Sequence, residues 1–403
     1  MFSRVSSFNK AVSQPRSYLI VFILSSLIAP SLILNKIVFL ILMIWTVSLL
    51  VKARSPRPKL MFPAFVIIAI FLYGYLRAEP TSNDLQIALQ FFLSTLILFL
   101  IHFIEYFKID IDDTISFCGK VLGFYSIIYI AIYFTPNMPY RSDAIEFFET
   151  INMARVGTRD FFDNSDIVFI GLSFTPFLYL PFCLAFLKLR KKLSFSKLIW
   201  FLIYGSIIVV SGRRGAITVC LLFIVFAITA YRSFILRISS MVMAYVLIFM
   251  SVSYLILPNT NLFSLSERSN EIKIGHLESF FDQLNWTDSI FGSGLGSYYY
   301  SYGKNIMVSY TELTLIDMFR YFGIPLTVIV VFLMLLPIWY RSPFKGQREL
   351  VFVMFALYLI LFSMTNPVLI NSNGMLVVLW YWVKYREFKY ESNSISNSIY
   401  RAS

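Results

Sequence analysis

The sequence predicts an all-α polytopic membrane protein, and three observations support this prediction. Of the 403 residues, 58% are hydrophobic and 14% are charged, whereas soluble domains have about 45–50% and about 25%. The apolar residues form runs of about 15–25 residues between short charged segments, which is typical of helices that cross a membrane. The period-two alternation of an outer-membrane barrel is missing. The composition therefore excludes an ordinary water-soluble enzyme.

The apolar runs divide the chain into about 12 transmembrane helices within one integral membrane domain, residues 1–403. We expect these helices near residues 17–34, 37–51, 60–76, 85–104, 115–135, 166–187, 197–211, 215–231, 235–257, 312–340, 349–365 and 367–383. Asn366, Asn371, Ser372 and Asn373 interrupt the last two runs, so 11 spans is an alternative. The first run is too long for a cleavable signal peptide.

The positions of Lys and Arg predict the orientation in the membrane. With a cytoplasmic N-terminus, 23 of the 34 Lys and Arg residues lie inside, 10 outside, and Arg320 inside a span. We therefore expect cytoplasmic N- and C-termini in a bacterial inner (plasma) membrane. The net charge of +12 would indicate nucleic acid in a soluble protein. Here the orientation of the loops explains it, and we expect no nucleic-acid partner.

Two outer segments are long, residues 136–165 and 258–311, and no predicted cytoplasmic loop is comparable. We expect both to be periplasmic loops and the protein to act on that side. Residues 391–403 are rich in Ser and Asn, and we expect a flexible cytoplasmic tail there.

A tight outer turn, Ser211-Gly212-Arg213-Arg214-Gly215, carries two adjacent cations on the side where positive charge is disfavoured. Arginine offers a planar fork of donors that suits phosphate. The turn therefore predicts an anion site, most simply for the diphosphate of a lipid. The alternative is contact with lipid headgroups.

Three more outer motifs are candidates for ligand binding. Arg155 and Arg159 precede Asn164, and Arg268 lies in the second long loop; solvated loops with local ion pairs are the alternative. Gly292-Ser293-Gly294-Leu295-Gly296 lacks the βαβ unit of a dinucleotide site, so we expect a flexible loop near a ligand or another backbone. No metal-ligand spacing occurs, so we expect no metal or cofactor.

Three charged residues come at the outer end of the predicted span 312–340. Asp317 and Arg320 are three residues apart on one helix face, so we expect them to pair. Glu312 has no oppositely charged residue one turn on. It either complements the helix dipole or accepts a proton from an incoming hydroxyl.

The order of these motifs resembles the O-antigen polymerase (Wzy-type) and O-antigen ligase superfamily, over residues 150–380. Arg155-Val156-Gly157, the arginine turn, Arg268 and the glycine-rich segment are followed by Tyr310-Thr311-Glu312-Leu313 and Phe319-Arg320-Tyr321-Phe322-Gly323-Ile324. Ligases carry a His where this chain has Thr311-Glu312, which favours a polymerase.

The resemblance implies a GT-C-like membrane glycosyltransferase that transfers a glycan from undecaprenyl diphosphate to an acceptor hydroxyl, without metal or nucleotide. It implies lipid-linked donor and acceptor glycans, membrane lipids, a chain-length regulator and a flippase as partners. We expect the catalytic residues to be Glu312, Arg213, Arg214 and Arg268. We expect the substrate-binding residues to be Arg155, Arg159, Asn164, Gly292, Gly294, Gly296 and Tyr298.

Two other functions compete with polymerisation of repeat units for O-antigen or a related surface polysaccharide. An O-antigen ligase would transfer the glycan to lipid A–core. A lipid-linked oligosaccharide flippase would show two similar halves and a charged central cavity, and the sequence contains no internal repeat.

Overall fold

The computed structural model describes residues 2–28, 33–52, 61–137, 140–150, 154–162, 165–229, 233–251, 268–336, 347–362 and 369–386. Of these residues, 79% are helical. The predicted helical class is therefore confirmed, with two short antiparallel hairpins that the prediction did not include.

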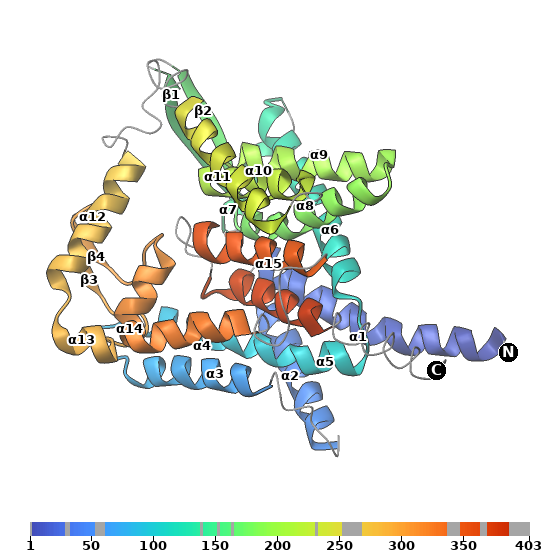
Figure 1. Ribbon diagram of the computed structural model, residues 1–403, viewed down its shortest axis with the longest axis horizontal. Coiled ribbons are helices and arrows are strands. Elements are labelled where there is room, and N and C mark those ends of the chain that lie inside the picture. The colour runs from blue at the N-terminus through green and yellow to red at the C-terminus, as the bar shows by residue number, and fades with distance from the viewer. Residues whose placement is uncertain are drawn as a thin grey trace.

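The first part of the chain forms helices that pack side by side (Figure 1). Their bounds are α1 Phe2–Ile28, α2 Ile33–Lys52, α3 Met61–Leu76, α4 Leu85–Thr95, η1 Leu96–Phe99, α5 Leu100–Tyr106, α6 Ile111–Phe134 and α7 Arg141–Thr150. The η1 segment is a 3₁₀ turn that joins α4 to α5.

The remainder of the chain contains both hairpins and the other helices. The bounds are β1 Ala154–Phe162, β2 Ser165–Leu172, α8 Thr175–Lys191, α9 Phe195–Val210, α10 Arg214–Ile228, α11 Phe234–Ser251, α12 Arg268–Gln283, α13 Trp286–Phe291, β3 Tyr299–Ser301, β4 Ile306–Val308, α14 Thr314–Leu335, α15 Gln347–Leu357, the π-helical η5 Tyr358–Phe362 and a last helix at 372–386.

Four helical segments are long and apolar enough to cross a membrane: Ile33–Lys52, Leu85–Tyr106, Ile111–Phe134 and Thr314–Leu335. Five shorter apolar helices lie at Gln14–Ile28, Met61–Leu76, Phe195–Val210, Arg214–Ile228 and Ile235–Val246. These segments support a membrane protein built of helices. The number of about 12 spans stays a prediction.

The predicted helix 166–187 is wrong in its first part. Residues Ser165–Leu172 form β2, which pairs with β1, and α8 begins only at Thr175. A proline occupies the first turn of α8, where its missing N–H costs no helical hydrogen bond. The apolar stretch of β2 from Ile167 to Leu172 looks helical by hydropathy alone, because periodicity does not separate a short apolar strand from a helix.

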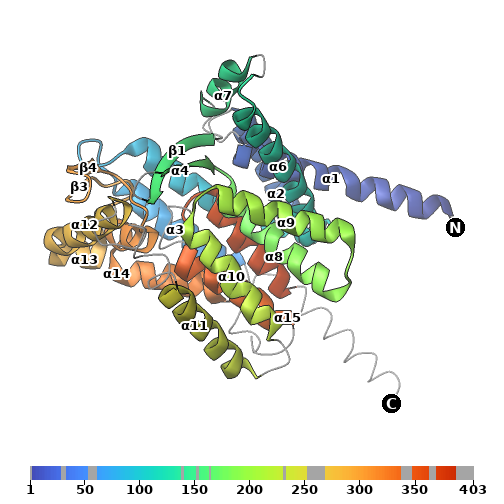
Figure 2. The same ribbon diagram turned by 90° about the horizontal axis from the view of Figure 1, so that it is seen from above.

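The two segments expected as long loops are largely folded. The first contains α7 and β1, and the second contains α12, α13 and the β3–β4 hairpin. In both views α12, α13, β3 and β4 gather at the end of the molecule opposite the N-terminus (Figures 1 and 2). Residues 252–267 and 391–403, the latter with the expected tail, lie outside the described residues.

The ion pairs join charged residues that the sequence assigns to the same side of the membrane. Lys188 contacts Asp113 at 3.3 Å and Lys384 contacts Asp112 at 2.9 Å, all in segments predicted to be cytoplasmic. At the opposite end, Lys273 contacts Glu312 at 3.5 Å. The orientation of these segments in the membrane itself stays a prediction.

Candidate functional site

The arginine turn begins where α9 ends at Val210 and is held against the β1–β2 hairpin. Gly212 has a φ of +63°, and a Cβ at this position would lie 2.2 Å from the ring of Phe169 on β2. The backbone therefore needs glycine both for its left-handed conformation and for this contact. As a result, Arg213 becomes the N-cap residue of α10, and Arg214 is its first residue.

Arg213 turns inward from this position and is partly buried. Its Nη2 donates to the carbonyl oxygen of Leu172 at the end of β2, at 3.4 Å. Burial lowers the pKa of Arg213, and the nearby charges of Glu312 and the phenol of Tyr358 oppose that shift. Glu312, about 100 positions further along the chain, is thus one of the charges near Arg213.

Arg214 points toward α12, a helix that lies within the predicted second loop. Its Nη2 donates to Oδ1 of Asn270 at 3.3 Å. Both side chains are partly buried. The two adjacent arginines thus have different neighbours, Arg213 on β2 and Arg214 on α12.

Glu312 lies in the turn between β4 and α14, two residues before the helix begins. It therefore lies just outside the helix, at the outer end of the predicted span 312–340. Its side chain is 48% exposed, and Oε2 is 3.5 Å from Nζ of Lys273 on α12. A carboxylate at this place is open to an incoming ligand and has a cation beside it.

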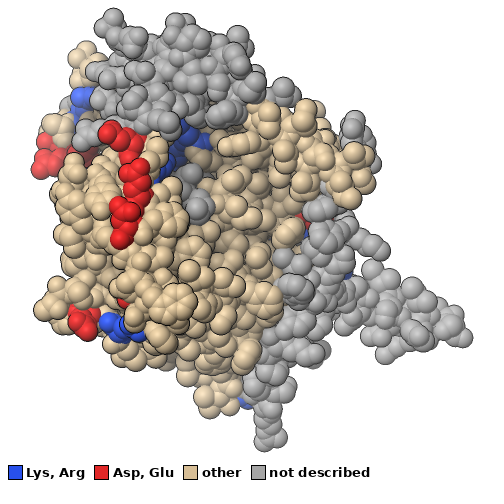
Figure 3. All heavy atoms as spheres, turned by 60° about the vertical axis from the view of Figure 1, so that its left-hand side comes forward, with Lys and Arg blue, Asp and Glu red and all other residues tan. Residues whose placement is uncertain are grey.

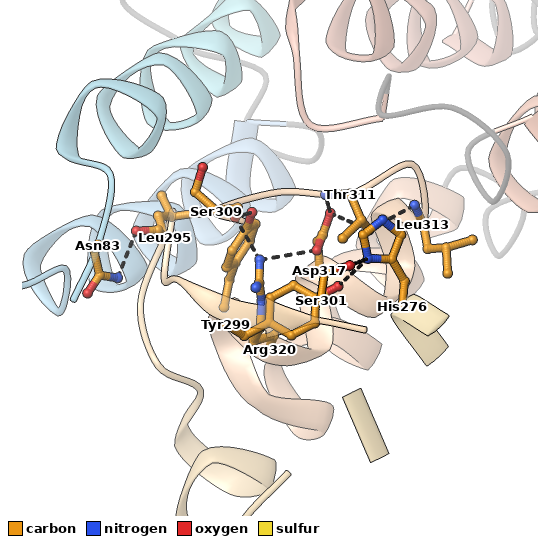
Figure 4. Close-up of polar contacts among 11 residues, drawn as sticks. Asn83, His276, Leu295, Tyr299, Ser301, Ser309, Thr311, Leu313, Asp317 and Arg320 are labelled. Carbon is orange, nitrogen blue, oxygen red and sulfur yellow. Dashed lines mark hydrogen bonds and ion pairs between the residues drawn. The ribbon is translucent and has the colours of Figure 1, made fainter. Parts of the chain in front are cut away.

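The backbone on both sides of Glu312 is fixed by Asp317. The Thr311 N–H and hydroxyl donate to Oδ2 of Asp317 at 2.6 and 3.0 Å, and the Leu313 N–H donates to the Thr311 hydroxyl at 3.0 Å. Asp317 is 2% exposed. The turn that presents Glu312 is therefore anchored to the first turn of α14 (Figure 4).

The predicted pair of Asp317 and Arg320 is confirmed, with a separation of 3.2 Å. Arg320 Nη2 also donates to the carbonyl oxygen of Ser309 at 2.6 Å, and its guanidinium lies 4.1 Å from the ring centre of Tyr299. Tyr321 donates to the same Ser309 oxygen at 2.6 Å. A buried charge needs such partners to be tolerated. Both charged residues support the turn and do not face the solvent.

A buried histidine docks α12 onto β3 beside this network (Figure 4). Nδ1 of His276 lies 3.0 Å from the Tyr299 hydroxyl and 2.9 Å from the Ser301 hydroxyl. Burial, together with the positive charges of Lys304 and Arg320, lowers the pKa of His276 to about 4. The ring is fully buried. It is therefore a neutral packing group and not a base for an external substrate.

The glycine-rich segment 292–296 packs against other parts of the chain. A Cβ at Gly292 would lie 2.3 Å from the Tyr321 carbonyl oxygen, one at Gly294 2.9 Å from the Arg77 backbone, and one at Gly296 2.5 Å from the Asp84 carbonyl oxygen. The expected close approach is thus an approach of these glycines to the backbone of other segments. The segment is held by hydrogen bonds and is not the flexible loop that we expected.

Hydrogen bonds hold this segment in place. The Ser293 N–H donates to the Arg320 carbonyl oxygen at 2.7 Å, and the side-chain amide of Asn83 donates to the carbonyl oxygens of Ser293 and Leu295 at 3.2 and 3.0 Å. The segment ties the α3–α4 connection to α14. These contacts explain the glycines by packing, and their predicted contact with substrate stays a prediction.

The other predicted residues have varied positions. Arg155 is exposed on β1, and Tyr298 is 41% exposed just before β3. Arg159 lies on β1 and Arg268 begins α12, but their side chains lie outside the described part. Asn164 lies outside the described residues altogether. Of the predicted residues, Arg214 and Glu312 thus both contact α12, and Glu312 is one of the charges near Arg213.

Sequence reasoning missed the residues of α12 that complete the site. Asn270 and Lys273 contact Arg214 and Glu312 respectively, and both were assigned to a loop. They are three apart, so they share one face of the helix. The helical pattern of residues 268–283 could have predicted α12. It could not have predicted which residues elsewhere in the chain this helix contacts.

The space around the site has both polar and apolar parts. On the face that carries α12, α13, β3 and β4, Lys and Arg side chains lie in a hollow beside a strip of Asp and Glu (Figure 3). An apolar groove of 420 Å³ runs between α8 and α9 and ends next to the arginine turn. Its lining residues are Phe182, Phe201, Leu202, Gly205, Ser206, Val209 and Val210.

Among the described residues, no group of three or more His, Cys, Asp or Glu is arranged to hold a metal ion. Comparison of the chain with protein-family models found no match, and neither did comparison with curated proteins or with solved structures.

Proposed function

We propose that this protein is a membrane glycosyltransferase that polymerises undecaprenyl-diphosphate-linked oligosaccharide repeat units of O-antigen or a related surface polysaccharide. The observation that carries the proposal is the meeting of Arg213, Arg214 and Glu312 around α12. Two arginines suit a diphosphate, and an exposed carboxylate beside them suits an acceptor hydroxyl. The reaction would take place at the periplasmic face of a bacterial inner membrane.

The arginines would act on the leaving group. As the bond between the anomeric carbon and the diphosphate oxygen breaks, negative charge grows on undecaprenyl diphosphate. Cations held in place stabilise that charge more in the transition state than in the bound donor. Arg213 and Arg214 are held by contacts with Leu172 and Asn270, so little reorganisation would be needed.

Glu312 would act on the acceptor. The acceptor hydroxyl oxygen attacks the anomeric carbon from the face opposite the diphosphate, and its proton passes to the Glu312 carboxylate. The new glycosidic bond forms as the diphosphate leaves, so the configuration inverts without a metal. A base must come within about 2.6–3.2 Å of the hydroxyl, and the half-exposed side chain of Glu312 leaves room for such contact.

The groove between α8 and α9 supports a lipid-linked donor. It is apolar, and its last lining residue, Val210, is followed directly by the Ser211-Gly212-Arg213-Arg214 turn. A phosphate bound by the arginines would therefore have a hydrocarbon-compatible surface beside it. Such a polymerase requires two protein partners: a flippase that delivers the lipid-linked units and a regulator of chain length.

The proposal is tested with purified protein in lipid nanodiscs and lipid-linked repeat units extracted from a strain that lacks the gene. We expect a ladder of lengthening glycans from the wild type and none from the Arg213→Ala, Arg214→Ala double variant. Arg141→Ala is the matched control, because Arg141 is an outward arginine bound to the Tyr133 carbonyl oxygen. In the same assay with lipid A–core added, transfer of a single unit to lipid A–core without chain extension would instead identify a ligase.

A further inference from the structure

One helix contacts both halves of the candidate site. On α12, Asn270 accepts a hydrogen bond from Arg214 at 3.3 Å, and Lys273 lies 3.5 Å from Glu312. Residues three apart on a helix lie on the same face. The separation between the arginine turn and Glu312 is therefore spanned by less than one turn of α12.

The helix is seated closely enough to keep this face in place. A Cβ on Gly275 would lie 2.3 Å from the backbone nitrogen of Gly303, so the helix backbone lies directly against the β3–β4 turn. The Tyr302 N–H donates to the Ser279 hydroxyl at 2.7 Å, and the Gln283 amide bonds both the N–H and the carbonyl oxygen of Tyr300. These contacts hold the helix on the C-terminal side of Lys273, and the Asn270 contact with Arg214 holds it on the N-terminal side.

The side chain of Glu312 needs such a fixed point. Asp317 anchors the backbone of its neighbours, but the glutamate side chain has three rotatable bonds and is 48% exposed. Lys273 is the more buried partner, at 24% exposure of its side chain. Its ammonium group contacts Oε2 and so leaves the other carboxylate oxygen, Oε1, to meet a hydroxyl group.

We propose that Lys273 is a positioning residue that orients the Glu312 carboxylate for proton transfer. The inference rests on the proposed function, because it concerns the same site. Lys273 exchanges no proton with the substrate; the proton of the acceptor hydroxyl goes to Glu312. A misplacement of about 1 Å at a reacting group costs up to about 10²-fold in rate, so loss of this contact affects turnover more than stability.

The test measures kcat and KM for the extracted lipid-linked units in nanodiscs. We expect Lys273→Met to lower kcat by about 10–100-fold while KM for the donor stays within about twofold. Lys273→Arg keeps a cation in place and should retain most of the activity. Lys304→Met is the matched control, since it removes an exposed lysine from the β3–β4 turn of the same outer region. Its kcat should equal that of the wild type.

A double variant separates positioning from other roles. If Lys273 acts only through Glu312, adding Lys273→Met to Glu312→Gln lowers kcat no further. An additive loss, or a rise in KM for the donor at unchanged kcat, would show that Lys273 contacts substrate and would overturn the proposal. Equal thermal unfolding temperatures for both single variants exclude misfolding. A wild-type protein that extends no glycan would refute the proposed function itself, whatever the variants do.

Discussion

Replacement of Glu312 by glutamine changes the proposed base without changing its shape. Glutamine keeps the volume and the hydrogen-bonding oxygen of the side chain but cannot take up a proton at neutral pH. We expect Glu312→Gln to lose nearly all polymerisation while the amount of folded protein stays normal. Glu312→Asp, whose carboxylate is about 1 Å shorter in reach, should be intermediate.

The magnitudes separate a catalytic role from a structural one. A general base contributes about 10²–10⁴-fold, which corresponds to about 2.7–5.4 kcal/mol of the activation barrier. The contact that glutamine would weaken is the 3.5 Å pair with Lys273, in which the carboxylate is 48% exposed. Such exposed pairs contribute about 0.2–1 kcal/mol to stability. Loss of stability is thus too small to imitate loss of catalysis.

The assay is extension of purified lipid-linked repeat units, with the rate normalised to folded protein. The rate is followed by the length distribution of the products, and folded protein is measured by size-exclusion chromatography and thermal unfolding. If Glu312→Gln turned over within about threefold of the wild type, the loss would be much smaller than the rate contribution of a general base, and Glu312 would not be the base. In that case the arginines would be left as the only source of catalysis in the site.

Three further predictions concern the arginine turn, the buried histidine and the orientation. Arg214→Lys should lose about tenfold or more in turnover at normal protein level, because an ammonium cannot replace a two-pronged contact; wild-type activity would reduce the turn to a headgroup contact. The pKa of His276 is lowered to about 4 in the fold, against about 6.5 unfolded. The unfolded chain therefore binds the extra proton between these values, and stability falls as pH drops from about 6.5 to about 4, with little further loss from this group below that. Thermal unfolding against pH measures this, and a His276→Gln variant should show a shallower slope. Reporter fusions after Ile145 or Asn285 should report the periplasm and those after Phe195 the cytoplasm; a cytoplasmic signal at Asn285 would contradict the assignment of the active side.

Hydropathy predicted the helices well because burial in a membrane demands long apolar runs whatever their partners. The predicted run 85–104 corresponds to α4, η1 and α5, and 115–135 corresponds to α6. It was less successful at 166–187 and 312–340. The first begins with a strand paired to β1, and the second is kinked at Gly323, whose φ is +76°, and ends at Leu335.

Of the candidate site, the sequence predicted only the residues whose charges are unusual for their position. Arg213, Arg214 and Glu312 stand out because charge on the outer side or at a membrane boundary is costly. Pairing of Asp317 with Arg320 follows from a spacing of three on one helix and was found at 3.2 Å. The glycines of 292–296 were expected near a ligand or a backbone, and the structure places backbone beside them.

The sequence by itself determined the class of the protein, the approximate position of its helices and which outer residues carry unusual charge, because these properties depend on composition and on neighbours along the chain. Only the tertiary structure decided that the second outer segment folds into α12 and a hairpin, and that Lys273 and Asn270 face Glu312 and Arg214. The physical reason is the distance along the chain over which each kind of interaction acts. Hydropathy and helical spacing act over a few residues, whereas the contacts that build this site join segments 39 to 56 positions apart and depend on the packing of α12 against β3.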